Sequence, residues 1–276
     1  ANASITRAQM DVLVNTAPDI VKALAPQAGA DRQALVSAFD GALLRLQGDA
    51  TLSRGDRMSA LIGRVDLARL DQPKDTLTPK LPAALIKQVR EEVARADKEI
   101  TDGYERQAVI TAAAYLQGQA GLWKESDALL KSSLAKSHSP YYLMSGLAGN
   151  ARKQGRTAEA LGWYEQAFAK SVGPATRLQW GAAYFTALVE LAPTDAARIE
   201  KTAAQLIQEA GSQQGAFYER SARSMQRVGK MLGTWNGQGQ HQAVVDRLRD
   251  QLAPVCAKLP AADAQKATCE SVLKKA

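Results

Sequence analysis

Two cysteines, Cys256 and Cys269, are the residues whose type and spacing bear most directly on chemistry. They flank the proline-containing segment 258–261, so they could close a disulfide across a helical hairpin, which requires an oxidising compartment. A loop of this length would restrain the unfolded chain by about 3 kcal/mol on the entropic model. Two alternatives remain open: buried thiols in a reducing compartment, or a thiol–disulfide oxidoreductase that uses this pair. More than about three helical turns of sequence separate the two cysteines, which favours a structural bond over an exchange site.

The other reactive residue types do not form a catalytic or metal-binding pattern. His138 and His241 are the two histidines, and their wide separation in sequence favours a loop or cap role over a zinc site. Ser139 follows His138, but adjacent residues point in different directions, so a hydrolytic dyad is not indicated. The sequence therefore predicts no enzyme activity, no cofactor and no metal site.

Two further motifs are too weak to carry a function. Gly237 and Gly239 form a G-x-G without a preceding strand or a following Lys-Ser/Thr, which favours a flexible linker over a phosphate-binding loop. Glu91, Glu92 and Asp97 alternate with basic residues, as on a solvated helix face. Neither motif points to nucleotide binding or to acid–base catalysis.

The formal charge of +7 at 276 residues would attract nucleic acid or anionic membrane if the cations formed one patch. They are dispersed among acids instead: Arg247 and Arg249, for example, lie beside Asp246 and Asp250. We therefore expect no nucleic-acid partner. Because the sequence contains no run of 18 apolar residues, we also expect no membrane insertion.

Helices must position these residues, because the chain is rich in Ala, Leu, Gln, Lys, Arg and Glu and has only 5% aromatic residues. Apolar spacing predicts helices over 31–47, from Ser53 to about 70 and over 82–100, with a proline-containing loop at 71–80 between the last two. Ser53 is the expected cap of the second of these. Residues 5–25 are expected to form one or two short helices broken near Ala17-Pro18.

A 34-residue period organises the middle of the chain. Ala135-Lys136-Ser137 and Pro140 recur as Ala169-Lys170-Ser171 and Pro174, and Gly121 recurs as Gly155. Each unit, 107–140 and 141–174, is expected to be two helices, the first ending at its glycine. Units of this length stack into solenoids that usually bind other macromolecules. A degenerate third unit is expected over 175–210. Further helices are expected over 217–231 and 241–276, with a long loop at 235–240.

The two units resemble the tetratricopeptide repeat. The second unit places Leu147, Ala148, Gly155, Ala160, Tyr164 and Ala167 at the positions where that repeat alternates large and small residues, and the first places Ala114, Gly121, Ser126, Leu130 and Ser133 there. Both units carry proline at position 34, where the family prefers position 32. The resemblance implies an all-α fold of antiparallel helix pairs stacked as a right-handed superhelix.

In proteins of this family the first helix of each pair lines a concave groove, which implies a set of groove residues here. From the first unit to the third, these are Thr111, Tyr115, Gln119, Tyr142, Ser145, Gly149, Arg152, Lys153, Gln179, Ala183 and Thr186. The groove could hold an extended peptide, with Arg152 pairing with a carboxylate. The alternative is that the N-terminal helices bury these residues. Tyr115 and Gly149 stand where the family's carboxylate-binding Asn would be, so that activity is not inherited.

A wider resemblance covers most of the chain. Four segments look like the helical C-terminal region of secreted thioredoxin-family proteins of Gram-negative bacteria: 100–106, 121–127, 136–144 and 217–221. That family's Cys-x-x-Cys pair is absent, so redox catalysis is not carried over. The resemblance implies a periplasmic or secreted, non-enzymatic module that binds or positions a protein. We expect three parts: helices over 1–101, repeats over 102–215, and C-terminal helices with the disulfide over 216–276.

Overall fold

The structure, a computed structural model, describes residues 3–274, which contain fourteen α-helices, one 3-10 helix and no strand. The predicted all-α class is therefore confirmed. The chain divides into two compact units, unit 1 up to Gly155 and unit 2 from Arg156. This division falls inside the second predicted repeat, and the three-part division at 101 and 215 stays a prediction.

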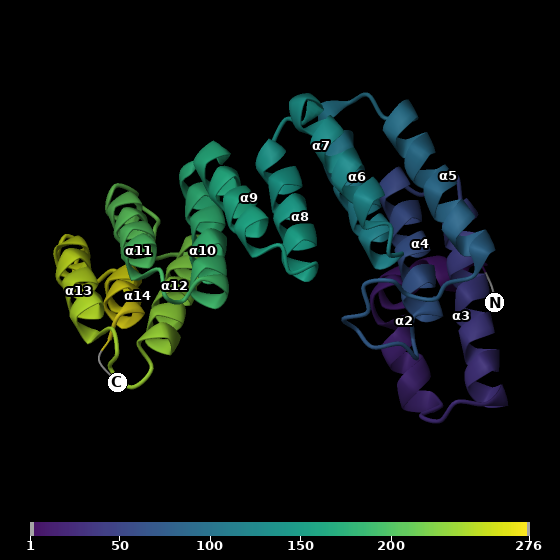
Figure 1. Cartoon of the computed structure of the whole chain (residues 1–276), viewed down its shortest axis with the longest axis horizontal. Coiled ribbons are helices and arrows are strands. Elements are labelled where there is room, and N and C mark those ends of the chain that lie inside the picture. Colours follow the sequence, from purple (N-terminus) through teal and green to yellow (C-terminus); the bar gives the residue numbers. More distant parts are fainter. Residues whose placement is uncertain (1–2, 275–276) are drawn as a thin grey trace. The chain divides into compact units, whose positions relative to one another are not determined.

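Unit 1 is built around α4, which packs against α2, α3, α5 and α6, while α6 also packs against α7 and α8 (Figure 1). Its helices are α1 (Ala3–Ala8), α2 (Met10–Leu24), α3 (Ala30–Gly48), α4 (Arg54–Ala68), α5 (Ala83–Glu99), α6 (Gly103–Gln119), α7 (Trp123–Ser133) and α8 (Pro140–Lys153), with a 3-10 turn at Leu134–Lys136. The predicted helices over 31–47 and 82–100 agree with α3 and α5 to within one residue at each end. Helices α4, α6 and α8 follow one another as first members of successive pairs, as a helical repeat requires.

The core of unit 1 next to the N-terminus lies where α2, α3 and α4 meet. Its buried members are small or aliphatic side chains: Ala17, Val21, Leu43, Leu46, Ala60, Leu67 and Leu70. They recur mostly at three- or four-residue steps within each helix, so each helix presents one apolar face. This core holds α2 and α4 together, and both helices contribute to the site described below.

The expected break near Ala17-Pro18 is wrong, because α2 continues through Pro18 and the break lies at Gln9. Proline inside a helix removes one backbone hydrogen bond and costs about 3 kcal/mol in an isolated helix. Here Ala17 and Val21 on either side are fully buried in the core, and that packing offsets the cost. The small side chain of Ala17 also limits the clash with the proline ring.

Local signals set the helix ends in the repeat region, as predicted. Gly121 and Gly155 follow α6 and α8 with φ of 79° and 71°, the left-handed conformation that favours glycine. At the end of α6 the backbone N–H of Leu122 donates to the carbonyl of Gln117, which closes the glycine cap. Ser53 caps α4 by accepting a bond of 3.0 Å from the backbone N–H of Asp56.

Unit 2 repeats the same arrangement of helix pairs. Its helices are α9 (Thr157–Lys170), α10 (Pro174–Leu191), α11 (Ala196–Gly211), α12 (Glu219–Asn236), α13 (Gln242–Ala257) and α14 (Ala264–Val272). Helix α10 packs on α12 and α12 on α14, while α11 packs on α13 (Figure 1). The degenerate third unit predicted over 175–210 corresponds to α10 and α11, and the helical-repeat character of the chain is confirmed.

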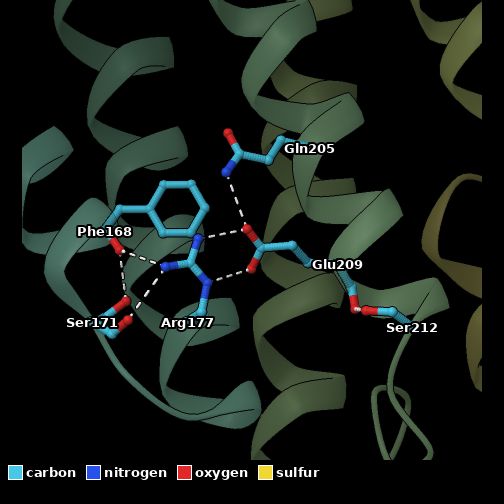
Figure 2. Close-up of polar contacts among 6 residues, drawn as sticks. All are labelled: Phe168, Ser171, Arg177, Gln205, Glu209 and Ser212. Atoms are coloured by element: carbon cyan, nitrogen blue, oxygen red, sulfur yellow. Dashed lines mark hydrogen bonds and ion pairs between the residues drawn. The ribbon is translucent and has the colours of Figure 1, made fainter.

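One part-buried polar cluster joins the helices at the start of unit 2 (Figure 2). Arg177 donates from Nε and Nη2 to the two carboxylate oxygens of Glu209, at 2.9 and 2.6 Å. Its third nitrogen donates to the carbonyls of Phe168 and Ser171 at the end of α9, and its guanidinium lies 4.9 Å from the Phe168 ring centroid. The side chain thus ties α9, α10 and α11 together, and the Glu209 carboxylate raises the pKa of Arg177.

The predicted loop at 235–240 begins later than expected, because α12 runs to Asn236. Trp235 causes the difference: its side chain is buried and its indole N–H donates to the carbonyl of Pro193 at 2.7 Å. Its ring also stacks on His241, the residue that precedes α13, with centroids 3.6 Å apart. These contacts are tertiary, so the local glycine-rich sequence did not show them.

Candidate functional site

Eight of the eleven predicted groove residues lie in unit 1, on α6 and α8, and Gln179, Ala183 and Thr186 lie on α10 of unit 2. Thr111, Tyr115 and Gln119 follow at four-residue intervals and share one face of α6. Five residues of α8 complete the set in unit 1: Tyr142, Ser145, Gly149, Arg152 and Lys153. None of the eleven is buried, so the alternative in which the N-terminal helices bury them does not hold.

Three of these residues line one cavity of about 370 Å³ in unit 1, which we call the α6–α8 cavity. They are Tyr115 and Gln119 from α6 and Lys153 from α8. The other walls come from α2, α4 and the loop after α4: Asn15, Pro18, Asp19, Lys22, Asp66, Arg69, Leu70, Gln72, Pro73 and Lys74. The N-terminal helices therefore contribute walls to the predicted surface and do not close it.

Arg69 organises the rim of the α6–α8 cavity. Its Nη1 donates to the side-chain and backbone oxygens of Gln119, at 2.6 and 2.8 Å, and its Nη2 donates to the carbonyl of Thr76 at 3.2 Å. The loop predicted at 71–80 is thereby held against the end of α6. This arrangement fixes the Gln119 amide, whose oxygen faces Arg69 and whose NH2 group is directed elsewhere.

The same loop packs closely against the turn after α6. The indole N–H of Trp123 donates to the carbonyl of Leu77 at 2.6 Å. A Cβ atom at Gly121 would lie 2.9 Å from Cδ of Pro79, so glycine is needed here for space as well as for its positive φ. The loop is therefore an ordered wall of the cavity.

Two groups of the cavity, Asp66 and Tyr115, have shifted pKa values. Burial raises the pKa of the Asp66 carboxyl, and this effect outweighs the opposing charges of Arg69 and Lys153. Burial also raises the pKa of Tyr115, and the negative charge of Asp66 adds to that rise. Tyr115 therefore stays a neutral donor and acceptor at physiological pH, although half of its side chain is exposed.

Lys153 is the α8 residue that lines the cavity, and Gly149 lies one turn earlier on the same helix. Lys153 is exposed, and its ammonium group lies 5.9 Å from the Trp123 ring centroid. A Cβ atom at Gly149 would meet nothing within 4 Å, so the surface beside it is open. A ligand could therefore lie along α8 and reach the cavity between Tyr115 and Lys153.

The remaining predicted groove residues do not line this cavity. The Thr111 hydroxyl donates to the carbonyl of Gln107 within its own helix. The Tyr142 ring lies 5.1 Å from that of Tyr141. Ser145 and Arg152 lie on α8 outside the cavity wall.

Sequence reasoning missed the residues that α2, α4 and the end of α4 contribute, above all Asp66 and the C-cap residue Arg69. They precede residue 107, where the 34-residue period begins, so no repeat position assigned them to the groove. The one available signal was the polar loop at 71–80, which directly follows Arg69. The hydrogen bond from Arg69 to Gln119 joins residues 50 positions apart, and nothing in the local sequence indicates it.

The two cysteines lie on α13 and α14, and the structure joins them, with Cα atoms 5.6 Å apart. Both side chains are buried, at 4% exposure for Cys256 and 0% for Cys269. Thiol–disulfide exchange needs an accessible sulfur atom. The geometry therefore suits a staple between the last two helices better than an exchange site.

No other arrangement of reactive side chains emerges within residues 3–274. No group of three or more His, Cys, Asp or Glu side chains is placed there to hold a metal ion. His138 lies between the 3-10 turn and α8, with its ring 4.6 Å from that of Tyr104, and His241 precedes α13. No helix in this part of the chain is long and apolar enough to cross a membrane.

Comparison with known proteins gives no family assignment. No protein-family model matches the chain. No curated protein matches it either. Among solved structures, the chain is similar to the crystal structure of BtubC (BKLC) from P. vanneervenii, with 16% sequence identity and a TM-score of 0.46 over 86% of this chain and 96% of that one. We draw no argument from a likeness at this level.

Proposed function

We propose that this chain is a non-enzymatic protein-binding module that holds an extended segment of a partner protein along the exposed face of α6 and α8. The α6–α8 cavity carries this proposal, because it gathers Tyr115, Gln119 and Lys153 into one accessible, polar hollow. A half-exposed tyrosine offers a large contact area at low entropic cost, together with a hydroxyl group. Stacked helix pairs are a scaffold on which such surfaces are commonly carried.

The charges of the cavity define the partner segment as acidic. Its lining includes four cations, Lys22, Arg69, Lys74 and Lys153. These outnumber the two acids, Asp19 and Asp66. An acidic side chain of the partner next to Lys153 would gain a charge-assisted hydrogen bond. The exposed Arg152 on the same helix extends the basic surface beyond the cavity.

The proposal also includes a compartment and a family resemblance: the module is periplasmic or secreted and resembles the accessory region of a thioredoxin-family protein. The four resembling segments and the position of the cysteine pair support this part. A bridge between Cys256 and Cys269 fits an oxidising compartment. Intact mass of the chain purified from its native compartment should be two hydrogen masses lower before reduction than after it. Identical masses would remove the support that the cysteines give.

The binding proposal is tested by quantitative capture. Immobilised wild-type chain, a Tyr115→Ala/Lys153→Ala variant and a Tyr218→Ala/Lys230→Ala variant are incubated with native extract, and captured proteins are identified by mass spectrometry. The control variant removes the same residue types from exposed positions of unit 2. We expect at least one protein to be retained by the wild type and the control and lost from the cavity variant. Equal retention by all three chains would refute the assignment of this surface.

A further inference from the structure

Unit 1 contains a second and larger cavity, of about 460 Å³, which no part of the proposed peptide surface uses. It lies among the end of α3, the start of α4 and one face of α5, and we call it the α3–α5 cavity. Its lining is Leu44, Gln47, Gly48, Arg54, Arg57, Met58, Leu61, Gln88, Glu92, Arg95, Ala96, Glu99 and Val109. Its volume falls in the range of small-molecule sites.

The apolar part of this lining is continuous with the core. Met58, Leu61, Ala96 and Val109 are buried, whereas Leu44 is 46% exposed. An apolar body that covered these side chains would remove hydrocarbon surface from water. The cavity is therefore not suited to a bare, fully hydrated ion.

The acidic groups of the lining are already engaged with arginines. Glu92 lies 3.3 Å from Arg95, and Glu99 lies 4.0 Å from Arg54. Arg54 also pairs at 3.1 Å with Glu105, which lies outside the cavity lining. The carboxylates of the cavity therefore have cations of their own within it.

Arg57 is the exception among the three arginines. It forms no ion pair with any residue from 3 to 274, and its buried Nε–H has no hydrogen-bond acceptor. The Thr51 hydroxyl chiefly lowers the pKa of nearby Asp49, and the charge of Arg57 adds the smallest of the contributions. Arg57 thus brings one positive charge and a buried donor for which unit 1 supplies no acceptor.

Two amides of the lining have donors to spare as well. Arg64 Nη1 donates to Oε1 of Gln47 at 2.9 Å and to Oε1 of Gln88 at 2.7 Å. With both amide oxygens fixed on one guanidinium, the two NH2 groups must face elsewhere. Neither NH2 group finds an acceptor in the part of the chain that the structure describes. The unmet hydrogen-bonding capacity of the cavity is therefore donor capacity.

From this geometry we infer that the α3–α5 cavity binds a small amphipathic carboxylate. The carboxylate accepts from Arg57 and from the amide groups of Gln47 and Gln88, and its hydrocarbon body covers the apolar lining. Of the three arginines in the lining, Arg57 alone has no ion pair within the described residues, so the cavity offers one uncompensated cation, which matches a monoanion. A phosphate dianion would bring a second negative charge close to Glu92 and Glu99 and is disfavoured.

Octanoate is a suitable probe, because it combines one carboxylate with a short hydrocarbon chain. Isothermal titration with the full chain measures its affinity, and octanol, acetate and inorganic phosphate are titrated in parallel. We expect saturable binding of octanoate, with each of the other three binding at least about tenfold more weakly.

Variants locate the site. Arg57→Gln removes the unpaired charge and should weaken octanoate binding about tenfold or more, as loss of a charge-assisted hydrogen bond does. Arg45→Gln, on the exposed side of α3 next to Leu44, is the matched control and should leave the affinity unchanged. Leu44→Glu places a like charge at the exposed edge of the apolar lining and should also weaken binding. Leu44→Glu tests the site independently if Arg57→Gln fails to fold.

Three results would each overturn the inference. The first is the absence of saturable octanoate binding to the wild type. The second is an affinity for octanol or for phosphate equal to that for octanoate. Equal binding of octanol would show that the carboxylate is not recognised, and equal binding of phosphate would show that the hydrocarbon chain is not recognised. The third is unchanged octanoate affinity in a folded Arg57→Gln or Leu44→Glu variant. Because the residues of the α6–α8 cavity are untouched, none of these results bears on the peptide proposal.

Discussion

Arg177 in unit 2 and Arg57 in unit 1 occupy the same position in their helices, each being the fourth residue of a first helix of a pair. Arg177 has an acceptor for every nitrogen: the Glu209 carboxylate and two carbonyls of the α9 terminus (Figure 2). Arg57 has none within the described residues. The same residue type in the same place is therefore part of the architecture in one unit and available to a ligand in the other.

Packing shows the same contrast. A Cβ atom at Gly229 on α12 would lie 1.9 Å from the backbone oxygen of Val272 on α14, whereas one at Gly149 on α8 would meet nothing. At Gly229 the backbone of α12 is closed against α14, whereas at Gly149 the surface of α8 is open. In unit 1, the surface of α6 and α8 and the two cavities leave space and hydrogen-bonding groups unused. Binding is therefore expected on unit 1.

The largest expected difference in stability is between alanine substitutions at Gly229 and at Gly149. Gly229→Ala should lower the free energy of unfolding by about 3 kcal/mol, because the backbone of α14 must move away. Gly149→Ala should raise it by about 0.5–1 kcal/mol, because alanine favours a helix interior and finds room. Urea denaturation followed by circular dichroism measures both changes. A loss of stability in both variants would contradict the contrast in packing.

The cysteine pair gives the next largest effect. In the oxidised chain, Cys256→Ser/Cys269→Ser should cost about 3 kcal/mol, through the greater freedom of the unfolded chain. Wild-type chain with reductant is the control and should match the variant. If reductant leaves the urea midpoint of the wild type unchanged, the pair does not act as a staple of α13 and α14.

Removing Arg177 or Arg57 is expected to change the free energy of unfolding by a smaller amount than the changes above. Arg177→Ala should destabilise the chain by about 2 kcal/mol, since it leaves Glu209 part-buried without its cation. Arg57→Ala should change the free energy of unfolding by no more than about 0.5 kcal/mol, since it breaks no hydrogen bond or ion pair within the described residues and only a weak attraction to Asp49. Chemical denaturation of the two variants in one buffer tests the difference. Equal losses would show that Arg57 has a structural partner and would remove the contrast.

The smallest effect concerns Asp66 and depends on pH. Burial raises the pKa of Asp66 in the folded chain, so the fold binds the proton more tightly than the unfolded chain does. The free energy of unfolding therefore falls as pH rises between the unfolded and the folded pKa. Asp66→Asn should be more stable than wild type at about pH 7, by less than about 1 kcal/mol, and equal to it at about pH 3. A variant less stable at pH 7 would mean that attraction to Lys153 and Arg69 prevails.

The helices were predictable where the signals are local. Gly121, Gly155 and Ser53 mark helix ends through their own backbone or hydroxyl group, and the structure has them in those roles. The period of 34 residues predicted the successive helix pairs for the same reason, whereas the groove face assigned from it stays a prediction. Each of these features depends on contacts within about one repeat.

What could not be predicted depends on contacts between distant segments. Pro18 lies within a continuous helix because α3 and α4 bury its neighbours, and Trp235 extends α12 through a bond to Pro193, 42 positions earlier. The cavity walls that include Asp66 and Arg69 arise from helices outside the repeats. Nothing in the sequence indicated a role for Arg57, because that role follows from its lack of hydrogen-bond acceptors within the described residues.

Photocrosslinking from the α6 face tests the central claim most directly. A photoreactive phenylalanine analogue replaces Tyr115 in one chain and Tyr218 of unit 2, which is also exposed, in another, and both chains are irradiated in native extract. We predict a discrete protein adduct at position 115 that Lys153→Ala abolishes, and none of that mass at position 218. Identical adducts from both positions, or no adduct at position 115, would contradict the account.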